Sequence, residues 1–280
     1  MKCYLCGGKK SVIRPGRVRD DSKLKVHECL SCGLVFLSSF RHITKNFYQD
    51  SKMHDTAPDV ASWCRGTRWD DERRFKFLAP LMENKDLLDF GCGNGGFLIE
   101  AKSVAARVFG LELEKRLKSH HESFGLTVFE TLDNVDRKFD IITAFHVLEH
   151  LSDPAKEIRR LSGFLQKGGH IIVEVPNSDD AMLKLYKSEA FSRFTYWSCH
   201  LYLFNRETLG LLAKKAGLKV EYIKGIQKYS VSNHLHWLSK GLPGGHQKWS
   251  FLDSPELHAA YEKQLASLGI TDTVIASFSL

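Results

Sequence analysis

The chain has 280 residues, of which 43% are hydrophobic, and a formal net charge of +7. This length can bury one large α/β core together with a small additional module. No run of about 18 apolar residues is present, which excludes a membrane-spanning helix, and the first residues lack the apolar segment of a signal peptide. Seven cysteines without a secretion signal favour the reducing cytoplasm and metal binding over disulfide bonds.

The positive charge is concentrated in the first 45 residues. This segment holds ten Lys and Arg residues against Asp20, Asp21 and Glu28, and it accounts for the whole formal excess. The rest of the chain carries equal numbers of acidic and basic side chains. One interpretation is a solvated basic surface. The other is a surface that contacts phosphate, on a nucleotide-sugar or on RNA.

Two C-x-x-C-G motifs lie in this basic segment, at Cys3–Gly7 and Cys29–Gly33. Two such motifs can place four thiolates around one ion, in a closed tetrahedral zinc site. Redox-active C-x-x-C pairs are the alternative, but they need a thioredoxin-like βαβ context that is missing here. We therefore expect residues 1–45 to form a zinc ribbon that depends on the metal for much of its folding free energy. Its predicted ligands are Cys3, Cys6, Cys29 and Cys32.

Residues 46–66, which mix aromatic and polar side chains, are predicted to form a linker or lid. Thr67 is predicted to cap a helix that continues to about Met82, because Asp70 stands at the capping-box spacing. Pro80 is expected to end this helix early.

A glycine-dense loop follows the next apolar segment, which is Leu87–Phe90. Gly91, Gly93 and Gly96 match the pattern G-x-G-x-x-G, and a helix is expected to start directly after them. Glu112 follows at the end of a second apolar segment, where a carboxylate can hold two ribose hydroxyls. The pattern fits a dinucleotide, S-adenosylmethionine (SAM), or a tight strand–helix turn without a ligand.

Asp89 favours SAM, because it precedes the first glycine by two residues and a carboxylate there repels a pyrophosphate. SAM carries no phosphate, and its ammonium and sulfonium groups are compatible with a nearby carboxylate.

Alternating strands and helices continue along the chain and predict a doubly wound α/β sheet. The expected later strands are 139–145, 168–177, 218–223 and 273–278. An amphipathic helix is predicted over 206–217, with a glycine at its end. Residues 225–270 are predicted to be an insertion.

At this point the chain closely resembles the class I SAM-dependent methyltransferases. The segment LLDFGCGNGGF resembles the first motif of that family, FDIITAFHVLEHLSDP resembles its fourth-strand motif, and GGHIIVEVPN resembles its fifth strand. The resemblance covers about residues 68–280 and implies a seven-stranded Rossmann-like sheet in a methyltransferase domain over 67–280. The cofactor-binding residues that it implies are Asp89, Gly91, Cys92, Gly93, Gly95, Glu112, Leu113, Phe145 and His146. Cys92 is expected to be a small packing residue with no nucleophilic role.

With its zinc ribbon, the chain also looks like the bacterial methyltransferases of nucleotide-sugar and surface-polysaccharide pathways. The sugar C-methyltransferases of that group carry a further C-terminal domain for which this chain is too short. The resemblance therefore favours O-methylation.

O-methylation of a sugar needs a base near the methyl group, and histidine suits this role. His200, in a segment that resembles the family's H-L-x-x-F motif, is the preferred base, with a structural hydrogen bond as its alternative role. If the segment after residue 145 is helical, His146, Glu149 and His150 share one face. Glu149 and His150 are the further catalytic candidates, with packing of the cofactor loop as their alternative role. These four residues also partly resemble the divalent-ion site of small-RNA 2′-O-methyltransferases, with His146 in place of a carboxylate.

The leading hypothesis is a SAM-dependent methyltransferase that acts on a small, sugar-containing acceptor. The alternative is an RNA methyltransferase whose basic ribbon holds the phosphate backbone. A motif for base N-methylation is absent, because Val175-Pro176-Asn177 stands in its place. A non-catalytic scaffold would have no reason to retain Asp89, the glycines and Glu112 together.

Overall fold

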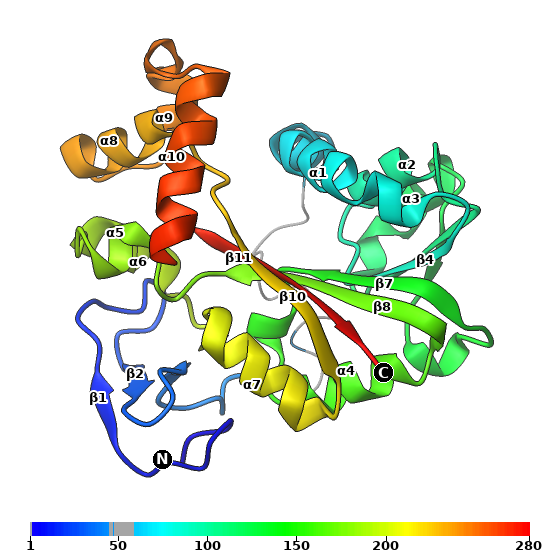
Figure 1. The fold of residues 1–280 in the computed structure, drawn as a ribbon, viewed down its shortest axis with the longest axis horizontal. Coiled ribbons are helices and arrows are strands. Elements are labelled where there is room, and N and C mark those ends of the chain that lie inside the picture. The colour runs from blue at the N-terminus through cyan, green and yellow to red at the C-terminus, as the bar shows by residue number, and fades with distance from the viewer. Residues whose placement is uncertain (1, 45–46, 48–58) are drawn as a thin grey trace. The chain divides into compact units, whose positions relative to one another are not determined.

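A computed structural model describes residues 2–44, 47 and 59–280 (Figure 1). The chain divides into two compact units. Unit 1 comprises the residues up to Phe40, then Leu148–Ala155 and Glu174–Ala276. Unit 2 comprises Arg41–Val147, Lys156–Val173 and Ser277–Leu280.

Unit 2 is built on parallel strands, and the side chains of the central ones are mostly buried. Strand β4 (Asp86–Phe90) pairs in parallel with β5 (Arg107–Leu111) on one side and with β7 (Phe139–Phe145) on the other, and β5 pairs with β6 (Thr127–Phe129). Leu87 and Leu88 of β4 are completely buried. Strands covered on both faces read as continuous apolar runs, and this is why the sequence located them.

Helices cover both faces of these strands (Figure 1). Helices α1 (Val60–Met82), α2 (Gly96–Ala101) and α3 (Lys118–Ser123) lie on one face, and α4 (Pro154–Ser162) lies on the other. Two 3-10 turns, Lys115–Leu117 and Leu132–Asn134, complete the connections.

Helix α1 begins earlier than the sequence predicted. Its N-cap is Asp59, whose carboxylate accepts a hydrogen bond from the Ser62 N–H at 3.2 Å. The predicted cap, Thr67, lies inside the helix, which also continues past Pro80 to Met82. Residues 60–66 of the predicted linker are therefore helical, while 45–46 and 48–58 lie outside the described residues.

Unit 1 contains a four-stranded sheet in the order β1-β2-β3-β9. Strands β1 (Ser11–Ile13), β2 (Val26–Cys29) and β3 (Val35–Leu37) form an antiparallel ribbon. Strand β9 (Tyr202–Leu203) pairs antiparallel with β3, with Phe36 opposite Tyr202 and Val35 opposite Leu203. The predicted ribbon therefore shares a sheet with a segment more than 150 residues further along the chain, a pairing that the sequence did not predict.

The remaining strands complete the predicted seven-stranded Rossmann-like sheet, whose order is β10-β11-β8-β7-β4-β5-β6. They are β8 (Leu165–Pro176), β10 (Lys219–Ile226) and β11 (Thr273–Ser279). Helix α7 (Arg206–Ala216) begins at a capping box on Asn205 and ends at Gly217, whose φ is 79°, as predicted.

Five further helices belong to the described part of the chain, and three of them lie in the predicted insertion. They are α5 (Ala181–Lys184), α6 (Glu189–Thr195), α8 (Val231–Lys240), α9 (Gly245–Lys248) and α10 (Pro255–Leu268), with 3-10 turns at Leu148–His150 and Ser250–Leu252. No helix within the described part of the chain has the length and hydropathy to cross a bilayer.

Candidate cofactor loop, cysteine cluster and histidine pair

The loop after β4 turns sharply into α2. Gly91, Gly93 and Gly95 have φ values of 77°, 53° and 77°, in the left-handed region that favours glycine. Gly91 also has a steric reason, because a Cβ there would lie 2.6 Å from Cγ2 of Val147. The loop therefore needs glycine for both conformation and space.

Five backbone N–H groups of this loop are bonded within the protein. Gly91 and Cys92 donate to the Leu111 carbonyl at 2.8 and 3.1 Å, and Gly95 donates to Cys92 at 2.9 Å. Gly93 donates to a Glu112 carboxylate oxygen at 2.8 Å, and Gly96 to the Asn94 side chain at 2.9 Å. A dinucleotide site uses N–H groups of such a loop to bind its pyrophosphate, so these five bonds leave fewer donors for a phosphate.

Glu112 is fixed in a position that suits a ribose. Its two carboxylate oxygens accept from the N–H groups of Gly93 and Glu114, both at 2.8 Å. A carboxylate oxygen has more than one lone pair, so each can still accept a hydroxyl. Glu112 can therefore hold a ribose diol without giving up the contacts that position it.

Helix α1 supplies a wall beside the loop that the sequence did not predict. The Trp63 ring lies 3.2 Å from the place that a Gly93 Cβ would take. Thr67 accepts a hydrogen bond from the Asn94 amide at 3.0 Å, and Asp71 approaches Gly96 so closely that a side chain there would collide with it. The sequence predicted that this helix begins at Thr67, and it therefore did not place Trp63 beside the loop.

The centre of unit 2 holds a cluster of buried charges. Arg74 lies 3.1 Å from Asp70 and 3.4 Å from Asp71, and its guanidinium stacks 4.6 Å from the centre of the Phe145 ring. Burial raises the pKa of Asp71 to about 6, although Arg74 opposes this shift. Burial also raises the pKa of Asp89 to about 7, although the Thr143 hydroxyl donates to it at 2.7 Å. The cluster therefore favours a bound cation that would restore the Asp89 charge.

The remaining predicted cofactor residues lie in different surroundings. Cys92 is buried against Gly110, and burial raises the pKa of its thiol, which fits the expected packing role. Phe145 packs edge-on against Phe97 at 4.9 Å. Leu113 is half-buried.

His121, on α3, also contributes to the geometry of the loop. It is 3% exposed, and its Nε2 donates to the Gly93 carbonyl at 2.7 Å. Its neighbour His120 makes the equivalent bond to the Asn94 carbonyl at 3.0 Å. Both histidines fix the loop from α3, and no sequence motif marks them.

The four predicted zinc ligands come together in unit 1. All four Sγ atoms lie within 4.8 Å of one another, and the pairs Cys3–Cys32 and Cys6–Cys29 lie at 3.6 and 3.5 Å. A tetrahedral ion with Zn–S bonds of roughly 2.3 Å sets sulfur atoms about 3.8 Å apart. The donor set and its spacing therefore fit zinc.

The backbone supports this cluster in the same way at both motifs. Gly7 donates to the Cys3 carbonyl at 3.0 Å and Gly33 to the Cys29 carbonyl at 2.9 Å, and both glycines have positive φ. The N–H groups of Gly8 and Ser31 point to thiol sulfurs at 3.4 Å. These bonds stabilise thiolates, which are the form that binds metal.

The predicted catalytic residues also meet in unit 1. Glu149, His150 and His200 each place a ligand atom within 4.8 Å of the others. His150 Nδ1 donates to the Cys199 carbonyl at 2.9 Å, and His200 Nδ1 donates to the Thr195 carbonyl at 3.0 Å. With Nδ1 protonated, each neutral ring leaves Nε2 as the acceptor.

His146 does not share a face with these residues, which corrects the helical expectation. Its φ of 54° is left-handed, and only Leu148–His150 forms a 3-10 turn. A left-handed residue cannot continue a helix. Its ring lies within 4.8 Å of the Asp70 carboxylate instead.

Asp89→Asn tests the buried charge. Because folding raises this pKa, the folded state binds more protons than the unfolded state, and the ionised carboxylate lowers stability as pH rises from about 4 to 7. Asparagine keeps the Thr143 hydrogen bond without this charge. We expect the cofactor-free variant to be more stable than the native chain by on the order of 2 kcal/mol at pH 8 and by much less at pH 4.

Urea unfolding at both pH values measures this difference. Asp86→Asn, in the same strand but near the surface, is the matched control and should show no comparable change. An equal response of the two variants, or none from Asp89→Asn, would contradict a buried charge at Asp89.

The cysteine cluster predicts one zinc ion per chain in the purified protein. Cys6→Ser and Cys32→Ser should each lose the ion and melt at a lower temperature, because zinc binding contributes to folding. Cys64→Ser, which changes a cysteine outside the cluster, should retain it. Native mass spectrometry with thermal melting makes both measurements, and a metal-free native chain with unchanged melting would refute the assignment.

Comparison with known proteins identifies the family of this domain. A family model described as "Methyltransferase domain" matches residues 65–223. The ubiquinone biosynthesis O-methyltransferase of Thiobacillus denitrificans is 31% identical over 175 residues, which cover 57% of this chain and 72% of that protein. The tRNA U34 carboxymethyltransferase of Campylobacter fetus is 26% identical over 167 residues, which cover 51% of this chain and only 58% of that protein.

Solved structures show the same fold. A SAM-dependent methyltransferase from Archaeoglobus fulgidus superposes with a TM-score of 0.51 at 18% identity, covering 77% of this chain and 96% of that one. The magnesium protoporphyrin IX methyltransferase of Synechocystis, solved with bound SAH, gives 0.51 at 12% identity, covering 85% and 98%. The fold and the family match lead to one conclusion: the chain belongs to the methyltransferase-domain family, with a SAM-dependent methyltransferase domain.

Proposed function

We propose that the protein transfers a methyl group from SAM to a hydroxyl of a sugar, nucleotide-sugar or polysaccharide intermediate. The observation that carries this proposal is the histidine pair, His150 and His200. Both rings are held by backbone carbonyls through Nδ1 and offer Nε2 as a proton acceptor. A hydroxyl acceptor needs such a base, because its proton must leave as the O–methyl bond forms.

The residues of unit 2 would hold the cofactor. When bound, SAM supplies an electrophilic methyl group on a sulfonium that departs as a neutral thioether. Glu112 would accept the ribose hydroxyls, and the Asp89 carboxylate would face the positive charge of the cofactor. Trp63 would cover the loop and exclude water from it.

The residues of unit 1 would handle the acceptor. His200 Nε2 would take the hydroxyl proton, and Glu149, within 4.8 Å of both histidines, would stabilise the imidazolium that forms. The carbonyls of Thr195 and Cys199 keep both rings oriented during this transfer. Trp197 packs against both, with ring centres 5.5 Å from His200 and 6.2 Å from His150.

Two further observations support O-methylation. The relative at 31% identity is an O-methyltransferase by name. The basic ribbon, which resembles that of the sugar methyltransferases, suits an acceptor that carries phosphate.

A second candidate function is methylation of RNA. It is favoured by the relative that is named a tRNA carboxymethyltransferase and by the charge of the first 45 residues. Zinc would hold the ribbon in either case.

Replacing the bases tests the proposal. We expect His200→Gln to lower kcat about 100-fold or more and His150→Gln to lower it less, because His200 is the preferred base. Both variants should bind SAM with unchanged affinity, because neither side chain is among the residues proposed to hold the cofactor. The ascending limb of the pH–rate profile should disappear in His200→Gln.

The assay measures transfer of labelled methyl from SAM to a panel of nucleotide-sugars and, separately, to unmodified tRNA. His258→Gln, on α10, is the control and should retain full activity. If tRNA is methylated and the nucleotide-sugars are not, methylation of RNA would replace O-methylation of a sugar as the function. Full activity of both histidine variants would contradict the hypothesis that a histidine acts as the catalytic base.

A further inference from the structure

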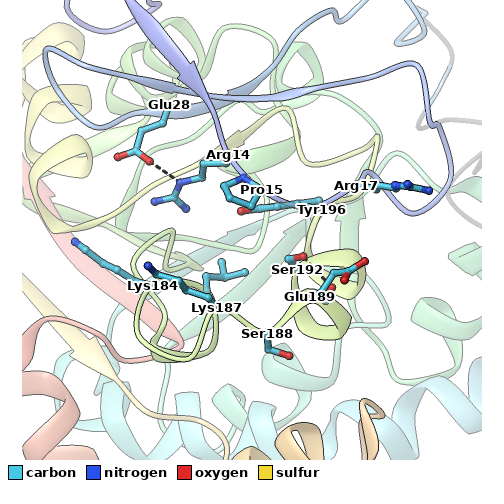
Figure 2. Close-up of a pocket in the computed structure, with 12 residues that line it drawn as sticks. Arg14, Pro15, Arg17, Glu28, Lys184, Lys187, Ser188, Glu189, Ser192 and Tyr196 are labelled. Carbon is cyan, nitrogen blue, oxygen red and sulfur yellow. Dashed lines mark hydrogen bonds and ion pairs between the residues drawn. The ribbon is translucent and has the colours of Figure 1, made fainter.

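A cavity of about 640 Å³ lies within unit 1, between the loop that follows β1 and helices α5 and α6 (Figure 2). Its lining includes Arg14, Pro15, Gly16 and Arg17 from the loop after β1, and Lys184, Lys187 and Tyr196 from the segment around α5 and α6. Figure 2 shows Lys184 and Lys187 on the Arg14 side and Arg17 at the opposite end. We call this cavity the basic pocket.

Arg14 is fixed firmly in the wall of the basic pocket. Its side chain is 12% exposed, donates to Glu28 at 2.6 Å and to the Ser178 carbonyl at 2.7 Å, and lies 3.7 Å from Asp179. Asp179 also pairs with Lys184 at 3.1 Å. These two cations are therefore balanced by the acids that position them.

Arg17 and Lys187 are not balanced. Neither forms an ion pair or side-chain hydrogen bond with any part of the chain that the structure describes. The other acid of the lining, Glu189, pairs with Arg193 at 2.9 Å. The basic pocket thus has an excess of about two positive charges, which matches the charge of a phosphate or diphosphate group.

Lys187 also has an unusual backbone. Its φ of 50° lies in the left-handed region, which is strained for a residue with a Cβ. Such strain persists where the surrounding structure imposes it, often beside a binding site. Here the turn between α5 and α6 places an unpaired ammonium at the edge of the basic pocket.

Tyr196 connects the basic pocket to the histidine pair. Its buried ring lines the basic pocket and also a small cavity of about 10 Å³ that His200 borders. A ligand anchored by its phosphates in the basic pocket would therefore be separated from the candidate base, His200, by the side chain of Tyr196. The volume is within the range of small-molecule sites, roughly 300–1,000 Å³, and exceeds what a single phosphate needs.

We propose that the basic pocket binds the diphosphate of a nucleoside-diphosphate-linked acceptor. This inference rests on the proposed O-methylation, whose substrate class it narrows. Arg14 and Lys184 would contact the diphosphate while remaining paired, and Lys187 and Arg17 would neutralise its charge. The nucleoside and sugar would occupy the rest of the cavity, beside Tyr196.

Calorimetric titration of the zinc-loaded full chain with pyrophosphate and with uridine diphosphate tests this proposal. Both probes should bind, uridine diphosphate more tightly. Lys187→Gln and Arg17→Gln should each weaken binding by about fivefold to tenfold, the modest effect expected of exposed cations. Lys187→Arg, which keeps the charge, should restore it, and Lys23→Gln, which removes an exposed cation outside the pocket, should change nothing.

No binding of either probe at millimolar concentration, or equal weakening in Lys23→Gln, would overturn the proposal. Single-stranded RNA that binds and is not displaced by pyrophosphate would overturn it in favour of a nucleic-acid surface. The titration needs neither SAM nor an acceptor. Binding without any O-methylation would therefore refute the proposed function, whereas O-methylation without diphosphate binding would refute only this pocket.

Discussion

Hydrogen bonding of the glycine-rich loop decides what unit 2 can bind. The N–H groups of Gly91, Cys92, Gly93, Gly95 and Gly96 all donate to atoms of the protein. Asp89 and Glu112 lie at this loop together with the aromatic and charged side chains of α1. A cationic cofactor would favour the ionised form of Asp89, whose pKa is raised by burial to about 7.

The sequence predicted the parallel core because its strands are buried on both faces. It also predicted the cysteine cluster, since the two C-x-x-C-G motifs have the local spacing that a four-thiolate site needs. It missed what depends on contacts between distant segments. The start of α1 was misplaced because Thr67 and Asp70 imitate a capping box, while their side chains bond to Asn94 and to arginines.

Other misses have the same physical origin. No sequence pattern around Tyr202 predicts that the two-residue strand β9 pairs with β3. The sequence did not predict the roles of His120 and His121, because their partners are backbone carbonyls, which no side-chain pattern reveals. His146 does not lie on the predicted helical face, because its own left-handed backbone conformation interrupts the helix.

The pairing of β3 with β9 has a consequence for engineering. The two strands supply each other's hydrogen bonds, and Arg14 of the ribbon is anchored by Ser178 and Asp179. The amino-terminal ribbon and residues 174–205 therefore form one structural unit that can be exchanged only as a whole. A chimaera that transplants acceptor preference from a related enzyme has to carry both segments together, because either one alone would leave an open sheet edge and an orphaned arginine.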